Sequence, residues 1–155
     1  MRLLLQRVKW AGVEVRQEEV ARIGPGLLIL AGFSIQDQED LPASRTWTKI
    51  LDKIPGLRIF PDHDGKSNLN LEDIQGQVLL VSQFTLFADC RKGRRPSFTR
   101  AAPADLANQL QQRLYQDLAC RLPSRVEQGV FGAEMEVAYC NWGPVSIILD
   151  SEDFQ

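Results

Sequence analysis

Most apolar residues of this chain fall into runs of strand length, and only two segments have helical periodicity. Val78–Phe84 is the clearest strand because valine and phenylalanine favour strands, and Leu27–Gly32 is a second apolar run of similar length. Many short strands combined with two helices are typical of a sheet that buries one face under those helices. We therefore expect an α+β fold, with two main helices packed on a largely antiparallel, barrel-like sheet, in a single domain over residues 1–155.

Spacing and turn residues predict the remaining elements. Val13 and Val15 alternate with polar neighbours, which indicates the first strand of a hairpin that returns through Val20 and Ile23. Helices are expected over residues 43–54, ended by Pro55-Gly56, and over residues 103–121, where leucines recur every four positions. Further short strands are expected over residues 57–60, 136–140 and 145–149, and a turn over residues 61–66.

Charge, cysteine content and hydropathy limit the classes of function. The net charge of −2 excludes a globally basic nucleic-acid coat, so any contact with RNA has to come from a local patch. Three widely spaced cysteines indicate neither a disulfide framework nor a CxxC site. No apolar run reaches the length of a signal peptide core or a membrane span, and we expect a soluble, cytoplasmic protein that contacts no membrane.

Conventional catalytic residues are scarce. The only histidine, His63, lies in the Asp62–Gly65 turn, so no Ser-His-Asp set is indicated. Asp62 and Asp64 lack the acidic residue that would complete a calcium loop. Phosphate-loop, dinucleotide-binding and zinc-peptidase motifs are missing as well. If the chain is an enzyme, backbone groups, hydroxyls or the substrate itself carry its chemistry, and we expect neither a metal nor a cofactor.

Two motifs point to a function. Each is ordinary alone, because hydroxyls at a strand end and Gly-Pro turns are common. They are Ser82-Gln83-Phe84-Thr85-Leu86 and Asn141-Trp142-Gly143-Pro144-Val145-Ser146. Together they resemble the signatures SQFTL and N-x-G-P-V-T of the D-aminoacyl-tRNA deacylase family. The resemblance extends over nearly the whole chain, through residues 5–8, 24–28, 58–60, 68–70, 95–98 and 131–135.

The resemblance implies a homodimeric hydrolase that proofreads translation. Such an enzyme cleaves D-aminoacyl-tRNA, and glycyl-tRNA formed on non-cognate tRNA, and rejects L-aminoacyl-tRNA. A cis Gly143–Pro144 bond would reach into the pocket of the partner subunit, where both carbonyl groups face the substrate's α-amino group and occupy the space of an L side chain. Arg7 would hold this motif in place. The substrate-binding residues implied in addition are Ser82, Gln83 and Met135.

The family's catalysis relies on the 2′-hydroxyl of the terminal adenosine of tRNA, with backbone donors around Phe84 and Thr85. Thr85 is expected to position the substrate, because a hydroxyl without an adjacent base is a weak nucleophile. The chain departs from the family at three positions. Trp142 replaces a small or acidic residue and would alter the pocket rim or pack at the dimer interface, Ser146 replaces threonine, and Val130 replaces a frequent arginine.

A basic segment follows the first motif. Arg91, Lys92, Arg94 and Arg95 are predicted to contact the phosphates of an acceptor stem, with Arg100 nearby. A solvated surface loop is the alternative interpretation. Two rival functions remain open at this point: an RNA-binding module that stacks bases on Phe84, Phe87 and Phe98, and a small-molecule esterase that uses Thr85 or Ser82. DNA is not an expected partner.

Overall fold

The computed structural model describes residues 1–154 and contains one sheet that carries most of the fold, beside a small two-stranded hairpin. The elements in chain order are β1 (Arg2–Val15), β2 (Glu18–Ile23), β3 (Gly26–Gly32), η1 (Leu41–Ala43), α1 (Arg45–Gly56), β4 (Phe60–Pro61), β5 (Ser67–Leu69), β6 (Gln77–Ser82), η2 (Phe84–Phe87), α2 (Ala104–Arg121), β7 (Val126–Gln128), β8 (Glu136–Asp150) and η3 (Ser151–Phe154). No helix in this part of the chain is long and apolar enough to cross a bilayer.

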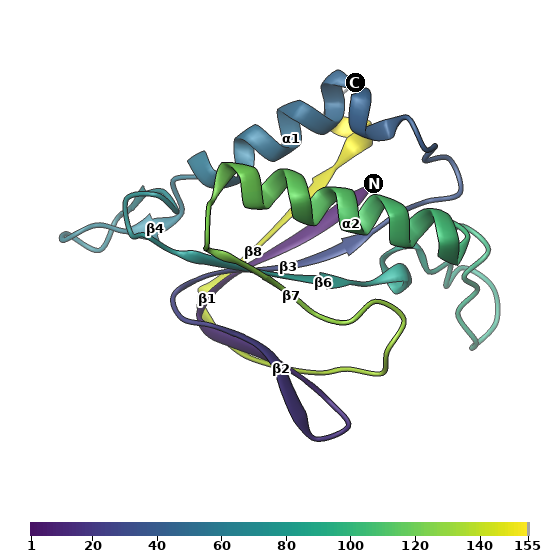
Figure 1. Ribbon diagram of the computed structural model, residues 1–155, viewed down its shortest axis with the longest axis horizontal. Helices are drawn as coiled ribbons and strands as arrows, with labels where there is room; N and C mark the ends of the chain where they lie inside the picture. The colour runs from purple at the N-terminus through teal and green to yellow at the C-terminus, as the bar shows by residue number, and fades with distance from the viewer. Residues whose placement is uncertain (155) are drawn as a thin grey trace.

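The main sheet is mixed, nearly closed and barrel-like, with both long helices on one face (Figure 1). Its strand order is β2-β1-β3-β6-β7, and β8 pairs with β1. β1 is antiparallel to β2, β3 and β8, whereas β6 is parallel to both β3 and β7. The expectation of a largely antiparallel sheet was therefore correct only in part. Each parallel pair is joined through a helix, which is the crossover connection that parallel neighbours require.

Two hydrophobic cores lie on opposite faces of the central strands. The first core packs Trp47 and Ile50 of α1 and Leu114 of α2 against the sheet, and the second fills the inside of the curled sheet. β3 contributes Ile29 to the first core and Leu28 to the second. Burial on both faces explains why this strand reads as a continuous apolar run without alternation.

Some element boundaries differ from those predicted. α1 begins after Ser44, whose hydroxyl accepts the N–H of Trp47 at 3.1 Å, and it continues through Pro55, so the predicted stop was wrong. Pro55 is tolerated because it lies in the last turn, where it removes only one helical hydrogen bond. Residues 57–59 are not a strand, and β6 ends at Ser82, so that Phe84 lies in a 3₁₀ turn. The predicted hairpin, both long helices and the turn over residues 61–66 are confirmed.

β8 is one long strand where two short strands were predicted. Two irregularities interrupt its pairing with β1, between the pairs Gln6–Ser146 and Val8–Asn141 and again before Trp10–Cys140. The first leaves residues 142–145 bulged out opposite Arg7, and the second leaves an extra residue at Lys9. An odd number of extra residues turns the following side chains to the other face. In β1, odd-numbered residues therefore face the first core at Leu5 but the second core at Val13. In β8, they face the first core at Leu149 but the second core at Val137.

Candidate active site

A cavity of about 580 Å³ opens at the carboxyl ends of β3 and β6. Small side chains at the start of α2, including Ala104 and Ala107, leave the space unfilled. Its lining is Ala31, Gly32, Phe33, Val81, Ser82, Gln83, Phe84, Phe98, Ala101, Ala102, Ala104, Ala107, Phe131, Gly132, Ala133, Met135 and Val137. The structure thus brings together four of the predicted site residues here, namely Ser82, Gln83, Phe84 and Met135.

At this cavity, the backbone that follows β6 packs closely against the end of β3. The N–H of Gln83 donates to the carbonyl of Ala31 at 2.7 Å, which keeps the end of β6 beside β3. A Cβ at Gly32 would lie 2.7 Å from the carbonyl oxygen of Gln83, so only glycine fits at this crossing. η2 then begins, and in residues 1–154 no acceptor is bonded to the backbone N–H groups of Phe84 and Thr85.

Thr85 lies beside the cavity rather than in its lining. Its exposed hydroxyl donates to Oε1 of Gln83 at 2.7 Å. Within the described chain, no hydrogen bond joins this hydroxyl to a histidine, a lysine or a carboxylate. The geometry therefore provides no general base that would activate Thr85 as a nucleophile.

The mouth of the cavity has an aromatic rim that connects it to the basic segment. Phe84 and Phe98 are both largely exposed and pack edge to face with ring centroids 4.9 Å apart. Phe98 lies three residues after Arg95 of the basic segment, and in Figure 1 this segment lies at the opposite end of the molecule from β4. The chain therefore passes from the basic segment directly into the lining of the cavity.

The basic segment is a loop closed at its base by two backbone hydrogen bonds between Asp89 and Ser97, of 2.7 and 2.9 Å. The guanidinium of Arg91 binds the carboxylate of Asp89 at 2.5 Å, and this hydrogen bond holds the pKa of Asp89 well below its ordinary value. The side chains of Lys92, Arg94 and Arg95 are exposed, and none forms an ion pair with another of the residues described here. These three cations are therefore more available to an anionic partner than Arg91.

The second motif forms an exposed turn on β8, and its Gly143–Pro144 peptide bond is cis, as the resemblance implies. Gly143 has φ +147°, and a Cβ built on it would lie 2.7 Å from Nη2 of Arg7. Arg7 is only 7% exposed; its Nε donates to the carbonyl of Trp142 at 2.5 Å, and Nη1 donates to the carbonyl of Ile59. Burial lowers the pKa of the Arg7 guanidinium from its usual value.

A polar network ties the two sides of this turn to β1. The Ser146 hydroxyl donates to Oε1 of Gln6 at 2.7 Å, and the side-chain amide of Asn141 donates to the same oxygen. Oδ1 of Asn141 accepts the N–H of Val145 at 2.9 Å. Gln6 was not predicted as a site residue, although it directly precedes Arg7. Because the bond to Gln6 needs only a hydroxyl, serine at position 146 serves as well as threonine.

Arg7, Gly143 and Pro144 do not line the cavity of the same chain. The predicted site residues thus form two groups in one protomer, one at the cavity and one at the turn on β8. Trp142 does not line the cavity of its own chain either, and its ring packs against Phe60 and Arg7.

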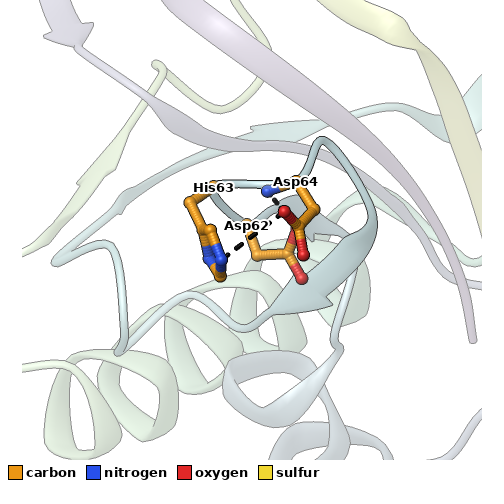
Figure 2. A group of neighbouring side chains, drawn as sticks. All are labelled: Asp62, His63 and Asp64. Atoms are coloured by element: carbon orange, nitrogen blue, oxygen red, sulfur yellow. Dashed lines mark hydrogen bonds and ion pairs between the residues drawn. The ribbon is translucent and has the colours of Figure 1, made fainter.

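The Asp62–His63–Asp64 group is a stabilised turn (Figure 2). Oδ1 of Asp62 accepts the backbone N–H groups of Asp64 and Lys66, each at 3.0 Å. The side chain of His63 is 90% exposed and lies 3.5 Å from a carboxylate oxygen of Asp64. One of the two carboxylate oxygens of Asp62 therefore caps the turn.

Comparison with known proteins places this arrangement in a family context. The sequence model of the family described as D-Tyr-tRNA(Tyr) deacylase matches residues 4–150. A D-aminoacyl-tRNA deacylase from Nitratidesulfovibrio vulgaris is 56% identical over 153 residues, which cover 99% of this chain and 94% of the relative. One from Solidesulfovibrio magneticus is 52% identical over 99% of this chain and 97% of the relative. The structure titled c-Myc DNA Unwinding Element Binding Protein has a TM-score of 0.86 and 35% identity, with 97% and 98% of the two chains covered.

Proposed function

Because the chain belongs to the D-Tyr-tRNA(Tyr) deacylase family, it is a D-aminoacyl-tRNA deacylase, and we propose that ester hydrolysis takes place in the cavity beside β6. One observation supports this location above all. The cavity has an aromatic rim and is lined by four of the residues implied by the resemblance, namely Ser82, Gln83, Phe84 and Met135. In the reaction, water attacks the carbonyl carbon, the ester C–O bond breaks, and a free amino acid and the terminal hydroxyl of tRNA are released.

The catalytic groups that we propose are backbone donors and the substrate. The N–H groups of Phe84 and Thr85, which have no acceptor in residues 1–154, would stabilise the negative charge that develops on the carbonyl oxygen of the ester. The 2′-hydroxyl of the terminal adenosine would assist the attack of water, because the site offers no histidine or activated hydroxyl of its own. Thr85, bonded to Gln83, would orient the peptide groups of η2.

For chiral selection, we propose that the Gly143–Pro144 turn of a second copy enters the cavity. Two observations support a homodimer. The first is that the residues of the turn do not line the cavity of their own chain. The second is that β8 pairs with β1 along one edge only in the described residues and exposes Tyr139 and Ile148, so its other edge is open to a second copy. The carbonyl groups of the turn would occupy the space that an L side chain needs. Glycine has no side chain, so glycyl-tRNA would be hydrolysed by the same site.

The tRNA would be held by the basic loop, through Lys92, Arg94 and Arg95 more than through Arg91. Phosphate contacts of this kind are independent of sequence, as an enzyme that serves many tRNAs requires. A proofreading role in translation would require the protein in the cytoplasm.

The test compares D-aminoacyl-tRNA with a version that has a 2′-deoxy terminal adenosine, on the parent protein and on Thr85→Val. We expect the 2′-deoxy substrate to bind normally and to be hydrolysed very slowly. Thr85→Val should keep partial activity, with a loss of about 1–3 kcal/mol of transition-state stabilisation. Fast hydrolysis of the 2′-deoxy substrate contradicts this mechanism. An acyl-enzyme trapped on the parent, with no turnover by Thr85→Val, would instead establish a covalent esterase.

A further inference from the structure

Arg7 is a buried cation that lacks a carboxylate partner among the residues described. Burial of an uncompensated charge is costly, so other groups have to replace its hydration shell. The carbonyls of Trp142 and Ile59 accept two of its hydrogen bonds. The indole ring of Trp142 adds a third interaction, because the guanidinium carbon lies 5.3 Å from the ring centroid. Trp142 therefore contacts Arg7 with both its backbone and its side chain.

The Trp142 ring also packs against Phe60. It lies 6.5 Å from the ring of Phe60 at an interplanar angle of 58°, and Phe60 is fully buried in the first core. Ile59, whose carbonyl binds Arg7, directly precedes Phe60. On the other side of Ile59, Arg58 donates to the Asn68 carbonyl at 2.7 Å. The region around β4 and β5 thus supports both the indole ring of Trp142 and the carbonyl group of Ile59 that binds Arg7.

The guanidinium of Arg7 in turn touches the backbone of the turn. The 2.7 Å separation between Nη2 and a Cβ built on Gly143 means that the cation packs directly against the glycine. A shift of Arg7 would therefore be transmitted to the carbonyl groups of Gly143 and Pro144. Trp142 does not line the cavity of its own chain, and its contacts with Arg7 give it a route to the turn.

We propose that the indole ring of Trp142 is a positioning element for the Gly143–Pro144 turn. Through its contacts with Phe60 and Arg7, it holds the guanidinium against Gly143 and so sharpens the discrimination between D- and L-aminoacyl-tRNA. This inference rests on the proposed role of the turn in chiral selection. It assigns a function to the residue at which this chain departs from the small or acidic residue common in the family.

Trp142→Ala and Trp142→Phe separate the ring from the backbone, because both variants keep the carbonyl that binds Arg7. Trp10→Ala is the matched control, since Arg22 lies 5.3 Å from the Trp10 ring, the same distance as in the Arg7–Trp142 pair, but this exposed pair takes no part in the contact between Arg7 and Gly143. kcat/KM is measured for D- and L-aminoacyl-tRNA carrying the same amino acid. The side-chain Nε–H resonance of ¹⁵N-labelled Arg7 reports on the guanidinium, and thermal unfolding reports on the fold.

We expect Trp142→Ala to lower the ratio of kcat/KM for D over L substrate about tenfold, which corresponds to about 1.4 kcal/mol. The Arg7 resonance should shift, Trp142→Phe should restore most of the ratio, and Trp10→Ala should keep the parent ratio. If Trp142→Ala alters only thermal stability and leaves both ratio and resonance unchanged, the proposal is overturned.

Gly143→Ala, measured in parallel, distinguishes this failure from failure of the proposed function. If Gly143→Ala lowers the D/L ratio and Trp142→Ala does not, the turn selects chirality without help from the ring. If Gly143→Ala leaves the ratio unchanged, the turn does not select chirality, and both the proposed function of the turn and the inference on Trp142 are overturned.

Discussion

Replacement of Gly143 by alanine tests the proposed role of the turn most directly. The new Cβ would lie 2.7 Å from Nη2 of Arg7 and 2.9 Å from Cγ2 of Val145, against at least 3.4 Å for ordinary van der Waals separation. The neighbours therefore have to move by about 0.7 Å in a part of the chain where Arg7 is tied to two carbonyls. The positive φ of +147° adds about 1–2 kcal/mol for a residue with a side chain.

The free energy of unfolding should fall by about 2–4 kcal/mol, which combines this strain with a weakened hydrogen bond of Arg7. A domain of this size tolerates such a decrease, so the variant stays folded with a melting temperature lower by about 5–15 °C. Hydrolysis of D-aminoacyl-tRNA by the folded variant should fall on the order of 100-fold, because a displacement approaching 1 Å misplaces the substrate.

The assay is single-turnover deacylation at a temperature where both proteins are folded. Gly65→Ala is the matched control, because Gly65 also has a positive φ, of +77°, but has no heavy atom within 4 Å of its Cβ position. It should lose stability from the backbone conformation alone and retain the parent rate. An unchanged rate in Gly143→Ala, or an equal loss of rate in Gly65→Ala, would refute the assignment of the turn to the site.

Other variants test the loop and the sheet. Neutralising Arg94 and Arg95 to glutamine should weaken tRNA binding and reduce the salt slope of log K by about 0.7–0.9 for each phosphate that the loop no longer neutralises. Arg91→Gln should change the slope less, because Arg91 already pairs with Asp89; equal slopes in all variants would remove the loop from the interface. Gly26→Ala should destabilise the fold by about 3 kcal/mol or more in urea unfolding, because its Cβ would lie 1.9 Å from the carbonyl oxygen of Gln77 across the β3–β6 pair. Gly56→Ala, with nothing within 4 Å, should be neutral or slightly stabilising, and a similar loss of stability in both variants would contradict this explanation.

The sequence predicts the elements of this fold better than the directions in which they pair. Apolar residues repeat at the period of an element when one of its faces is buried. The structure buries the faces that carry Val13 and Val15 in β1, and Leu110, Leu114 and Leu118 in α2. The spacing of apolar residues along β3 and β6 does not show that these two strands pair in parallel. The helix between the two strands is the only sign of it, and the prediction did not use that sign.

The site was harder to predict because its parts belong together only in space. Ser82, Gln83 and Phe84 meet Met135 at one cavity, although about 50 residues separate them along the chain. The bond between Gln6 and Ser146 links residues 140 positions apart and has no local signature. Trp142 was expected to alter the pocket rim or to pack at the dimer interface. Its contacts with Phe60 and Arg7 could not be predicted, because the pairing of β8 with β1 and the hairpin of β4 and β5 bring these residues to it.

The paired irregularities of β1 and β8 limit how the length of this chain can change during evolution. Between the pair Gln6–Ser146 and the pair Trp10–Cys140 there are four residue steps along β1 and six along β8. The two strands therefore differ by an even number of residues, so paired side chains still share a face. Deletion or insertion of one residue in the bulge would turn Val137 out of the second core, because side chains alternate along a strand. Changes of two residues keep every inward side chain in place. Length variants of this bulge are therefore expected to differ by pairs of residues.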